Sequence, residues 1–257
     1  MKKALFTVTF MTLISIAFIS ALAFIHEYSK DRIAQNLEID KYKSVLYAFN
    51  IFPASVSETD LAPTSTTADI SWENQQILET VQKKMKPIKL PVPEKLQLLL
   101  KDSFLSWKDS VDIFIRIDEN QKVIGYGFPL KGKGLWGTIE AFGVISADLT
   151  KMIGIDFTQQ VETPGLGARI TETEFKYFFR QLDLSGFQDQ TSDQAAIIMT
   201  RKKSQTNIEK SSNSLQAITG ATQTCQGVLE MLNVDLKFYI SVIKENEMLL
   251  RERGFQG

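Results

Sequence analysis

The chain contains very little of the two side chains that most often carry out enzyme chemistry. Among its 257 residues there is one cysteine, Cys225, and one histidine, His26. A single cysteine excludes a disulfide within the chain, and a single histidine excludes histidine-based catalytic triads and most zinc sites. Redox or hydrolytic chemistry would therefore need a cofactor to supply the reactive group. We expect no metal site and no catalytic residue of the chain's own.

The chain also lacks an excess of either charge. It has 29 Lys and Arg against 30 Asp and Glu. A protein that binds a polyanion normally carries basic excess, so we expect no nucleic-acid partner. The sequence shows no dinucleotide-binding fingerprint and no cluster of cysteines, and so offers no evident site for NADH or for an iron–sulfur centre.

A long apolar run near the N-terminus is the strongest compositional signal. Residues 4–25 carry no charge, and a helix of that length spans about 33 Å, enough to cross a bilayer. A cleaved signal peptide is the alternative, since Ala21-Leu22-Ala23 fits a small-x-small cleavage site, but the run exceeds the apolar length usual for one. No cysteine lies near the run, which excludes a lipoprotein anchor. We expect a retained single-pass anchor in the cell membrane, with the following domain on the periplasmic or extracytoplasmic side.

The rest of the chain predicts an α+β domain. Apolar residues at helical spacing predict a short amphipathic helix, docked on the domain, over residues 36–52, and a Pro/Ser/Thr-rich linker follows over 53–71. Residues 72–85 are weakly helical, and Pro93 fits a helix start. Two hairpins are predicted, one over residues 111–128 and one over 138–159, and "AAIIMT" (195–200) reads as a short buried strand. Thr171 and Glu174 form a capping-box pattern before an apolar helix. Local hairpins with segregated helices favour α+β over a doubly wound sheet.

Two glycine-rich runs interrupt this pattern, "PLKGKGLWG" (129–137) and "VETPGLGAR" (161–169). Each alone reads as a tight turn, in which glycine adopts positive φ and proline fixes the turn entry. Several such loops, each next to a predicted strand or helix, could instead converge at one edge of a sheet. Small residues there would let backbone N–H groups line a flat ligand with polar edges.

A third run, "SLQAITGATQT" (214–224), comes directly before an apolar stretch with helical spacing. A threonine at this place is normally an N-cap, whose oxygen accepts a hydrogen bond from the first helical turn. In the alternative, Gly220 lets the backbone approach a ligand and the helix N-terminus receives an anion such as a phosphate. From this run alone the cap is the more common arrangement.

Taken together, "KGKGLWG", "VETPGLG" and "AITGATQT", in a chain that begins with one membrane helix, resemble a known family. The family comprises the FMN-binding subunits of two membrane complexes, the Na⁺-translocating NADH:quinone reductase and the Rnf electron-transport complex. The resemblance covers residues 1–50 in layout and 110–240 in motif, and the "GLWG" run leans towards the quinone-reductase subunit.

The resemblance implies a covalent flavin. In that family a separate flavin transferase joins the FMN phosphate to the hydroxyl of the Thr after Gly-Ala, here Thr222. The implied cofactor-binding residues fall in the three runs: Leu135, Trp136, Glu162, Thr163, Gly165, Leu166, Gly167, Thr219, Gly220, Ala221, Thr222 and Thr224. One departure stands out, because the family pattern has Asp six residues before the acceptor and this chain has Gln216.

The implied function is that of an electron relay inside an ion-translocating redox complex of the quinone-reductase type, with integral membrane subunits as partners and no active site of its own. The FMN-binding subunit of an Rnf complex and a stand-alone flavin-binding protein of the cell envelope are the alternatives. We divide the chain into an anchor (1–30), a docking helix with linker and the N-terminal part of the soluble domain (31–110), and the FMN-binding core (111–257).

Overall fold

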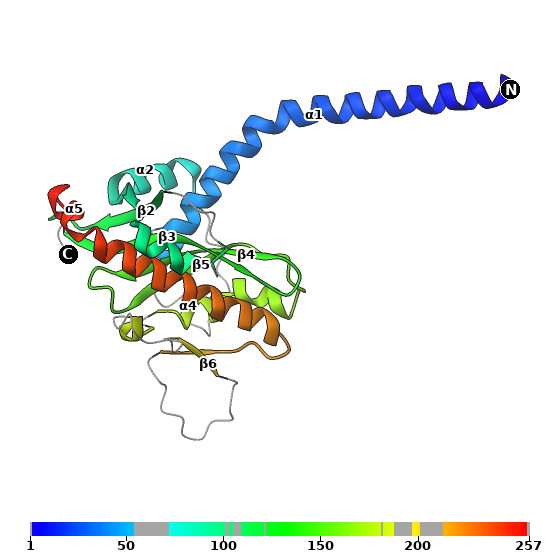
Figure 1. Ribbon diagram of the computed structural model, residues 1–257. Helices are drawn as coiled ribbons and strands as arrows, with labels where there is room; N and C mark the ends of the chain where they lie inside the picture. The colour runs from blue at the N-terminus through cyan, green and yellow to red at the C-terminus, as the bar shows by residue number, and fades with distance from the viewer. Residues whose placement is uncertain are drawn as a thin grey trace. The chain divides into compact units, whose positions relative to one another are not determined.

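The computed structural model describes residues 2–53, 72–100, 103–104, 109–120, 122–180, 182–187, 197–200 and 213–255. Within these ranges the chain is α+β, as predicted: helices combine with a five-stranded antiparallel sheet (Figure 1). The chain divides into two compact units, Met1–Lys41 and Tyr42–Gly257. The predicted linker falls almost wholly on residues 54–71, outside the described part.

The first helix, α1 (Lys2–Ala48), contains the predicted membrane segment. It includes an 18-residue stretch of mean hydropathy 2.4 in which no residue is buried, so it is long and apolar enough to cross a membrane. The separate docking helix predicted over 36–52 is wrong in one respect, because those residues continue α1 to Ala48 without a break. No proline or glycine occurs between the two segments, so nothing interrupts the backbone hydrogen bonds.

The C-terminal end of α1 does belong to the folded domain, as the apolar spacing predicted. Leu46 and Phe49 are fully buried. Asn50 adopts a left-handed conformation (φ 54°), and its side-chain amide donates to the carbonyl of Ile153 at 2.7 Å. Arg116 donates to the carbonyl of Phe49 at 3.0 Å, which satisfies an acceptor that the helix end leaves free.

The sheet has the order β1-β2-β3-β4-β5, and every neighbouring pair is antiparallel. Its strands are β1 (Met85–Pro91), β2 (Ser110–Ile117), β3 (Val123–Lys133), β4 (Thr138–Ser146) and β5 (Met152–Gln159). Both predicted hairpins are therefore confirmed. The first strand was not predicted, since Pro87 and Pro91 argue against a strand interior. They are tolerated because β1 is an edge strand that pairs only with β2.

A long helix, α4 (Thr222–Glu245), lies across one face of the sheet and packs on β3 (Figure 1). Its apolar side chains are buried, and Tyr239 stacks on Phe128 of β3 with ring centroids 4.1 Å apart. Smaller elements surround this core: α2 (Asn74–Lys84), η2 (Glu94–Leu100), η3 (Gly167–Thr171), α3 (Thr173–Tyr177), η4 (Ser185–Phe187) and α5 (Glu247–Glu252).

Two local predictions are wrong. The capping box at Thr171 does not form, because the Thr171 hydroxyl donates backwards to the carbonyl of Ala168 and Glu172 precedes the short helix α3 without a side-chain cap. The strand predicted as buried over 195–200 forms β6 (Ile198–Thr200), which pairs in parallel with β7 (Ser214–Gln216). It is not a buried strand, since Ile198 is 41% exposed.

Candidate functional site

The three glycine- and threonine-rich runs meet at one end of the sheet. The turn Gly134–Gly137 joins β3 to β4, and the loop 160–166 follows β5. Because β3 and β5 both run antiparallel to β4, they end on the same side of the sheet, and the two loops lie at that end of the strands. The turn before α4 joins them there, since Gly220 lies against the side chain of Leu166. The predicted convergence of the runs is thus present in the structure.

Glu162 connects the three loops directly. Its side chain is buried, and its Oε1 accepts a hydrogen bond from the backbone N–H of Trp136 at 3.0 Å. Its Oε2 accepts a hydrogen bond from the hydroxyl of Thr224 at 2.5 Å. The indole N–H of Trp136 also donates to the hydroxyl of Thr163 at 3.1 Å. The β3–β4 turn, the loop after β5 and the first turn of α4 are therefore held together by side-chain hydrogen bonds.

Large apolar side chains remain exposed around this junction. Trp136 is 68% exposed, and Leu135 and Leu166 are each nearly half exposed. Val161, which the sequence reasoning missed, is 58% exposed and packs against Gly137. It is the first residue of the glycine-rich run 161–169, and only its exposure identifies it as part of the site. We call Leu135, Trp136, Val161 and Leu166 the apolar rim.

The N-terminus of α4 is not capped in the manner that the sequence favoured. Ala221 occupies the N-cap position, and no side chain accepts a hydrogen bond there. Thr222 is the first helical residue and is exposed, as is Thr219 before it. Gly220 adopts φ 81°, which turns the chain into the helix. The threonines are therefore not caps. Thr222 lies beside the backbone N–H groups of the first turn, and no capping side chain accepts a hydrogen bond from them.

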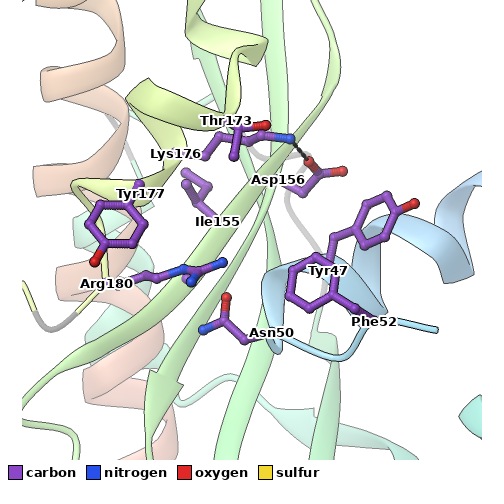
Figure 2. Close-up of a pocket in the computed structure, with 10 residues that line it drawn as sticks. Tyr47, Asn50, Phe52, Ile155, Asp156, Thr173, Lys176, Tyr177 and Arg180 are labelled. Carbon is purple, nitrogen blue, oxygen red and sulfur yellow. Dashed lines mark hydrogen bonds and ion pairs between the residues drawn. The ribbon is translucent and has the colours of Figure 1, made fainter. Parts of the chain in front are cut away.

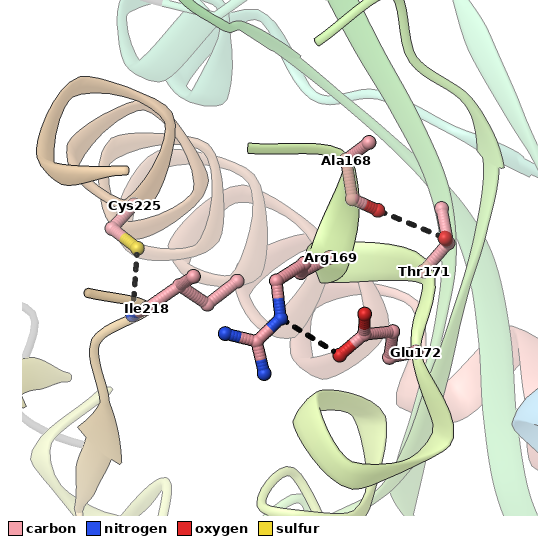
Figure 3. A network of polar contacts seen from close by, with 6 residues as sticks. All are labelled: Ala168, Arg169, Thr171, Glu172, Ile218 and Cys225. Atoms are coloured by element: carbon pink, nitrogen blue, oxygen red, sulfur yellow. Dashed lines mark hydrogen bonds and ion pairs between the residues drawn. The ribbon is translucent and has the colours of Figure 1, made fainter. Parts of the chain in front are cut away.

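Cys225 has no reactive character. Its side chain is buried on α4, its sulfur accepts a hydrogen bond from the backbone N–H of Ile218 (Figure 3), and burial raises the pKa of the thiol. Cys225 therefore fills space in the core, and its surroundings do not activate the thiol. Figure 3 also shows the exposed ion pair of Arg169 with Glu172, 3.0 Å long, next to the same turn.

The spacing Gly132–Gly134–Gly137 matches the glycine pattern of dinucleotide-binding loops, although the sequence was expected to hold no such fingerprint. Here, however, it joins two antiparallel strands and does not lead from a strand into a helix. The helix N-terminus that would receive a pyrophosphate in such a loop does not follow it. The run therefore gives no support for binding of NADH.

A small pocket of about 70 Å³ lies elsewhere on the domain, between the end of α1, β5 and α3 (Figure 2). Lys176 and the buried Asp156 form an ion pair across it, 2.7 Å long. Burial, with a contribution from the charge of Asp156, raises the pKa of Tyr47 to about 12. None of the predicted site residues lines this pocket.

Comparison with known proteins shows which domain contains the three loops. Residues 134–237 match the model of the FMN-binding domain. The chain is 33% identical over 135 residues to the C subunit of the Na⁺-translocating NADH-quinone reductase of Chlamydia pneumoniae, covering 49% of this chain and 42% of that protein. It is 29% identical over 117 residues to the G subunit of the ion-translocating oxidoreductase complex of Methanosarcina acetivorans, covering 46% and 52%. The chain thus spans about half the length of these curated relatives.

Solved structures share the fold. The crystal structure of Shewanella oneidensis NqrC matches with a TM-score of 0.58 at 16% identity, over 80% of this chain and 95% of that one. The C subunit of the Na⁺-translocating NADH-quinone reductase from Parabacteroides distasonis matches with a TM-score of 0.57 at 20% identity, over 83% and 96%. Residues 134–237 therefore form an FMN-binding domain, and the chain shares its fold with the C subunits of Na⁺-translocating NADH-quinone reductases.

Proposed function

We propose that this protein is an electron-relay subunit of a membrane-bound, ion-translocating redox complex, and that its FMN is joined to the Thr222 hydroxyl by a phosphoester. The quinone-reductase type is the first candidate, since "GLWG" and the first curated relative both point to it. The anchor helix would keep the domain near integral membrane partners, on the periplasmic or extracytoplasmic side.

One observation carries the proposal: an exposed threonine stands at the uncapped N-terminus of α4, next to the apolar rim. A helix N-terminus offers backbone N–H groups and a positive dipole end, both of which favour a phosphate. A planar aromatic ring needs exposed apolar surface to cover it, which the rim supplies. The residues present therefore fit a phosphorylated flavin.

The roles of the chain's own residues follow from their positions. Thr222 is the attachment point, and the first-turn N–H groups of α4 orient the phosphate oxygens. Leu135, Trp136 and Leu166 shield the ring from water, and Gly165 and Gly167 keep side chains out of the loop beside it. When bound, FMN supplies the capacity to accept and pass on electrons, and the protein supplies position and electrostatics.

The attachment is tested by intact mass and in-gel ultraviolet fluorescence of the full chain, expressed with a flavin transferase and purified in detergent. Loaded protein should exceed the apoprotein by one FMN less one water, because ester formation expels water. Thr222→Ala should abolish both signals, whereas Thr219→Ala should keep them. Fluorescence that survives in Thr222→Ala and disappears with Thr219 or Thr224 would overturn the assignment.

Gln216 provides a second test of the attachment. It lies in β7, six residues before Thr222, where the family pattern has Asp. If the transferase needs that carboxylate, Gln216→Asp should raise covalent occupancy. Equal occupancy in both proteins would show that the transferase accepts Gln216.

The relay role is tested by copurification from mild detergent and by flavin reduction in native membranes. A relay in such a complex should bring integral membrane partners with it, and NADH or reduced ferredoxin should reduce its flavin. Reduction by ferredoxin and not by NADH would favour the Rnf alternative over the quinone-reductase type. Absence of partners, with unchanged turnover in Thr222→Ala membranes, would leave only a stand-alone envelope flavin protein.

A further inference from the structure

We propose that Glu162 is a positioning residue that clamps the three loops of the site from beneath, and that it does not itself touch the flavin. The proposal rests on the proposed function, because it assigns a role within the same site. Both carboxylate oxygens of Glu162 are already engaged, one by the Trp136 N–H and the other by the Thr224 hydroxyl. With 5% of its surface exposed, the residue has almost no face left to offer a ligand.

The surrounding loops are shaped for this arrangement. A Cβ at Gly134 would collide with Oε1 of Glu162, and a Cβ at Gly167 would collide with the Thr224 hydroxyl. Glycine is therefore the residue at both close approaches: Gly134 next to the Glu162 carboxylate, and Gly167 next to the Thr224 hydroxyl. The two loops can close on Glu162 only because neither carries a side chain at these points.

The clamp also determines which hydroxyl is presented. Successive helical residues are rotated by about 100°, so residues 222 and 224 point in directions about 200° apart. Because Glu162 draws Thr224 inward, where it is 2% exposed, Thr222 must point outward. Glu162 thereby selects Thr222 as the accessible hydroxyl on the first turn of α4, without contacting it.

Hydrogen exchange of the Trp136 amide tests the clamp without any flavin. Thr224→Val removes the hydroxyl at nearly constant volume and leaves Oε2 of Glu162 without its donor. If the carboxylate links the loops, the Trp136 amide should exchange about tenfold faster in this variant, although residue 224 bonds to the other oxygen of Glu162. Glu162→Ala should have the same effect, because it removes both acceptor oxygens. Glu230→Gln, a change on the same helix away from the carboxylate, is the control.

Flavin binding supplies the second measurement. In a Thr222→Ala background, which cannot form the ester, affinity for free FMN should fall about tenfold with Glu162→Ala, Glu162→Asp or Thr224→Val. Glu162→Asp keeps the charge and shortens the reach by one methylene, so it separates position from charge. In loaded protein, the flavin reduction potential should change in Glu162→Asp as well as in Glu162→Gln.

Three results would overturn the clamp. Trp136 exchange that stays at the control rate in Thr224→Val would show that the loops are not coupled through the carboxylate. A potential that changes only in Glu162→Gln would make Glu162 a through-space charge, and one that changes in neither variant would leave it a purely structural residue. If wild-type protein carries no flavin at all, the proposed function fails while the exchange experiment still decides the coupling.

Discussion

Two buried carboxylates connect α4 to β3 or to the turn that follows it, and each accepts one backbone N–H and one hydroxyl. Asp235, in the middle of the helix, accepts from the Lys131 N–H at 2.9 Å and from the Ser103 hydroxyl at 2.7 Å. Glu162 accepts from the Trp136 N–H and, at the helix N-terminus, from Thr224. The same set of donors, one backbone N–H and one hydroxyl, thus occurs at both carboxylates.

The surroundings of the two carboxylates differ. Asp235 is fully buried one helical turn before Tyr239, whose ring stacks on Phe128, and burial raises the pKa of Asp235 to about 6. Glu162 lies under an apolar rim that is open to solvent. The middle of α4 is therefore built for stability and its N-terminal end for binding, so substitutions in the two regions should have separable effects.

Phe128→Ala should give the largest effect and should act on stability alone. Truncating a fully buried phenylalanine typically lowers the free energy of unfolding by about 3–5 kcal/mol. Urea unfolding of the full chain in detergent measures the loss. Leu166→Ala, at the half-exposed rim, should change stability by less than about 0.5 kcal/mol but weaken FMN binding. A Phe128→Ala protein that folds but no longer takes up flavin would show that the effects on stability and on binding are not separable.

Asp235→Asn should change how stability depends on pH. Because the folded-state pKa is raised to about 6, folding favours the protonated acid. This contribution is fully present below about pH 4 and is lost as pH rises through 6. Relative to Asp235→Asn, wild-type protein should therefore lose on the order of 1–3 kcal/mol of unfolding free energy between pH 4 and pH 7. Unfolding curves of both proteins that stay parallel over this range would contradict the assignment.

Gly220→Ala should give a small loss of stability and a clear loss of flavin. An L-residue at φ 81° costs about 1 kcal/mol, and its Cβ would lie 3.0 Å from the Leu166 side chain, inside the site. Gly254→Ala is the matched control, because Gly254 has φ 84° and nothing lies within 4 Å of its Cβ position. Both variants should lose similar stability, and only Gly220→Ala should lose covalent occupancy in the mass spectrum.

The sequence predicted the features that depend on local pattern. The β-branched and aromatic residues of 111–117, and the two apolar runs of 138–159 on either side of a polar turn, predict strands because such side chains pack well on a pleated sheet. The apolar run predicts α1 because its length matches a bilayer. The three runs that contain Gly134, Gly165 and Gly220 predicted loops, and the resemblance suggested that the loops form one site, which the structure brings together.

The features that were missed depend on contacts between distant residues. Pro87 and Pro91 fit in β1 only because the strand is at the edge of the sheet, and a single sequence does not show strand order. Thr171 is a local exception: its hydroxyl donates to the carbonyl of Ala168 in place of forming the expected cap, and the local sequence is compatible with either hydrogen bond. The inward position of Glu162 depends on a partner 62 positions away, Thr224. No local sequence pattern shows that two residues so far apart in the chain are in contact.

The order of the strands in the sheet has a consequence for how the protein comes to be folded. Each strand pairs with the next one along the chain, so the sheet can assemble from successive short-range hairpins, which form quickly. In contrast, α4 follows all five strands in sequence and closes its long-range contacts with β3 afterwards. The proposed attachment site, Thr222, is then placed by the part of the domain whose contacts form last. An attaching enzyme that requires the completed turn would modify only molecules that have finished folding, and the flavin would mark them as such.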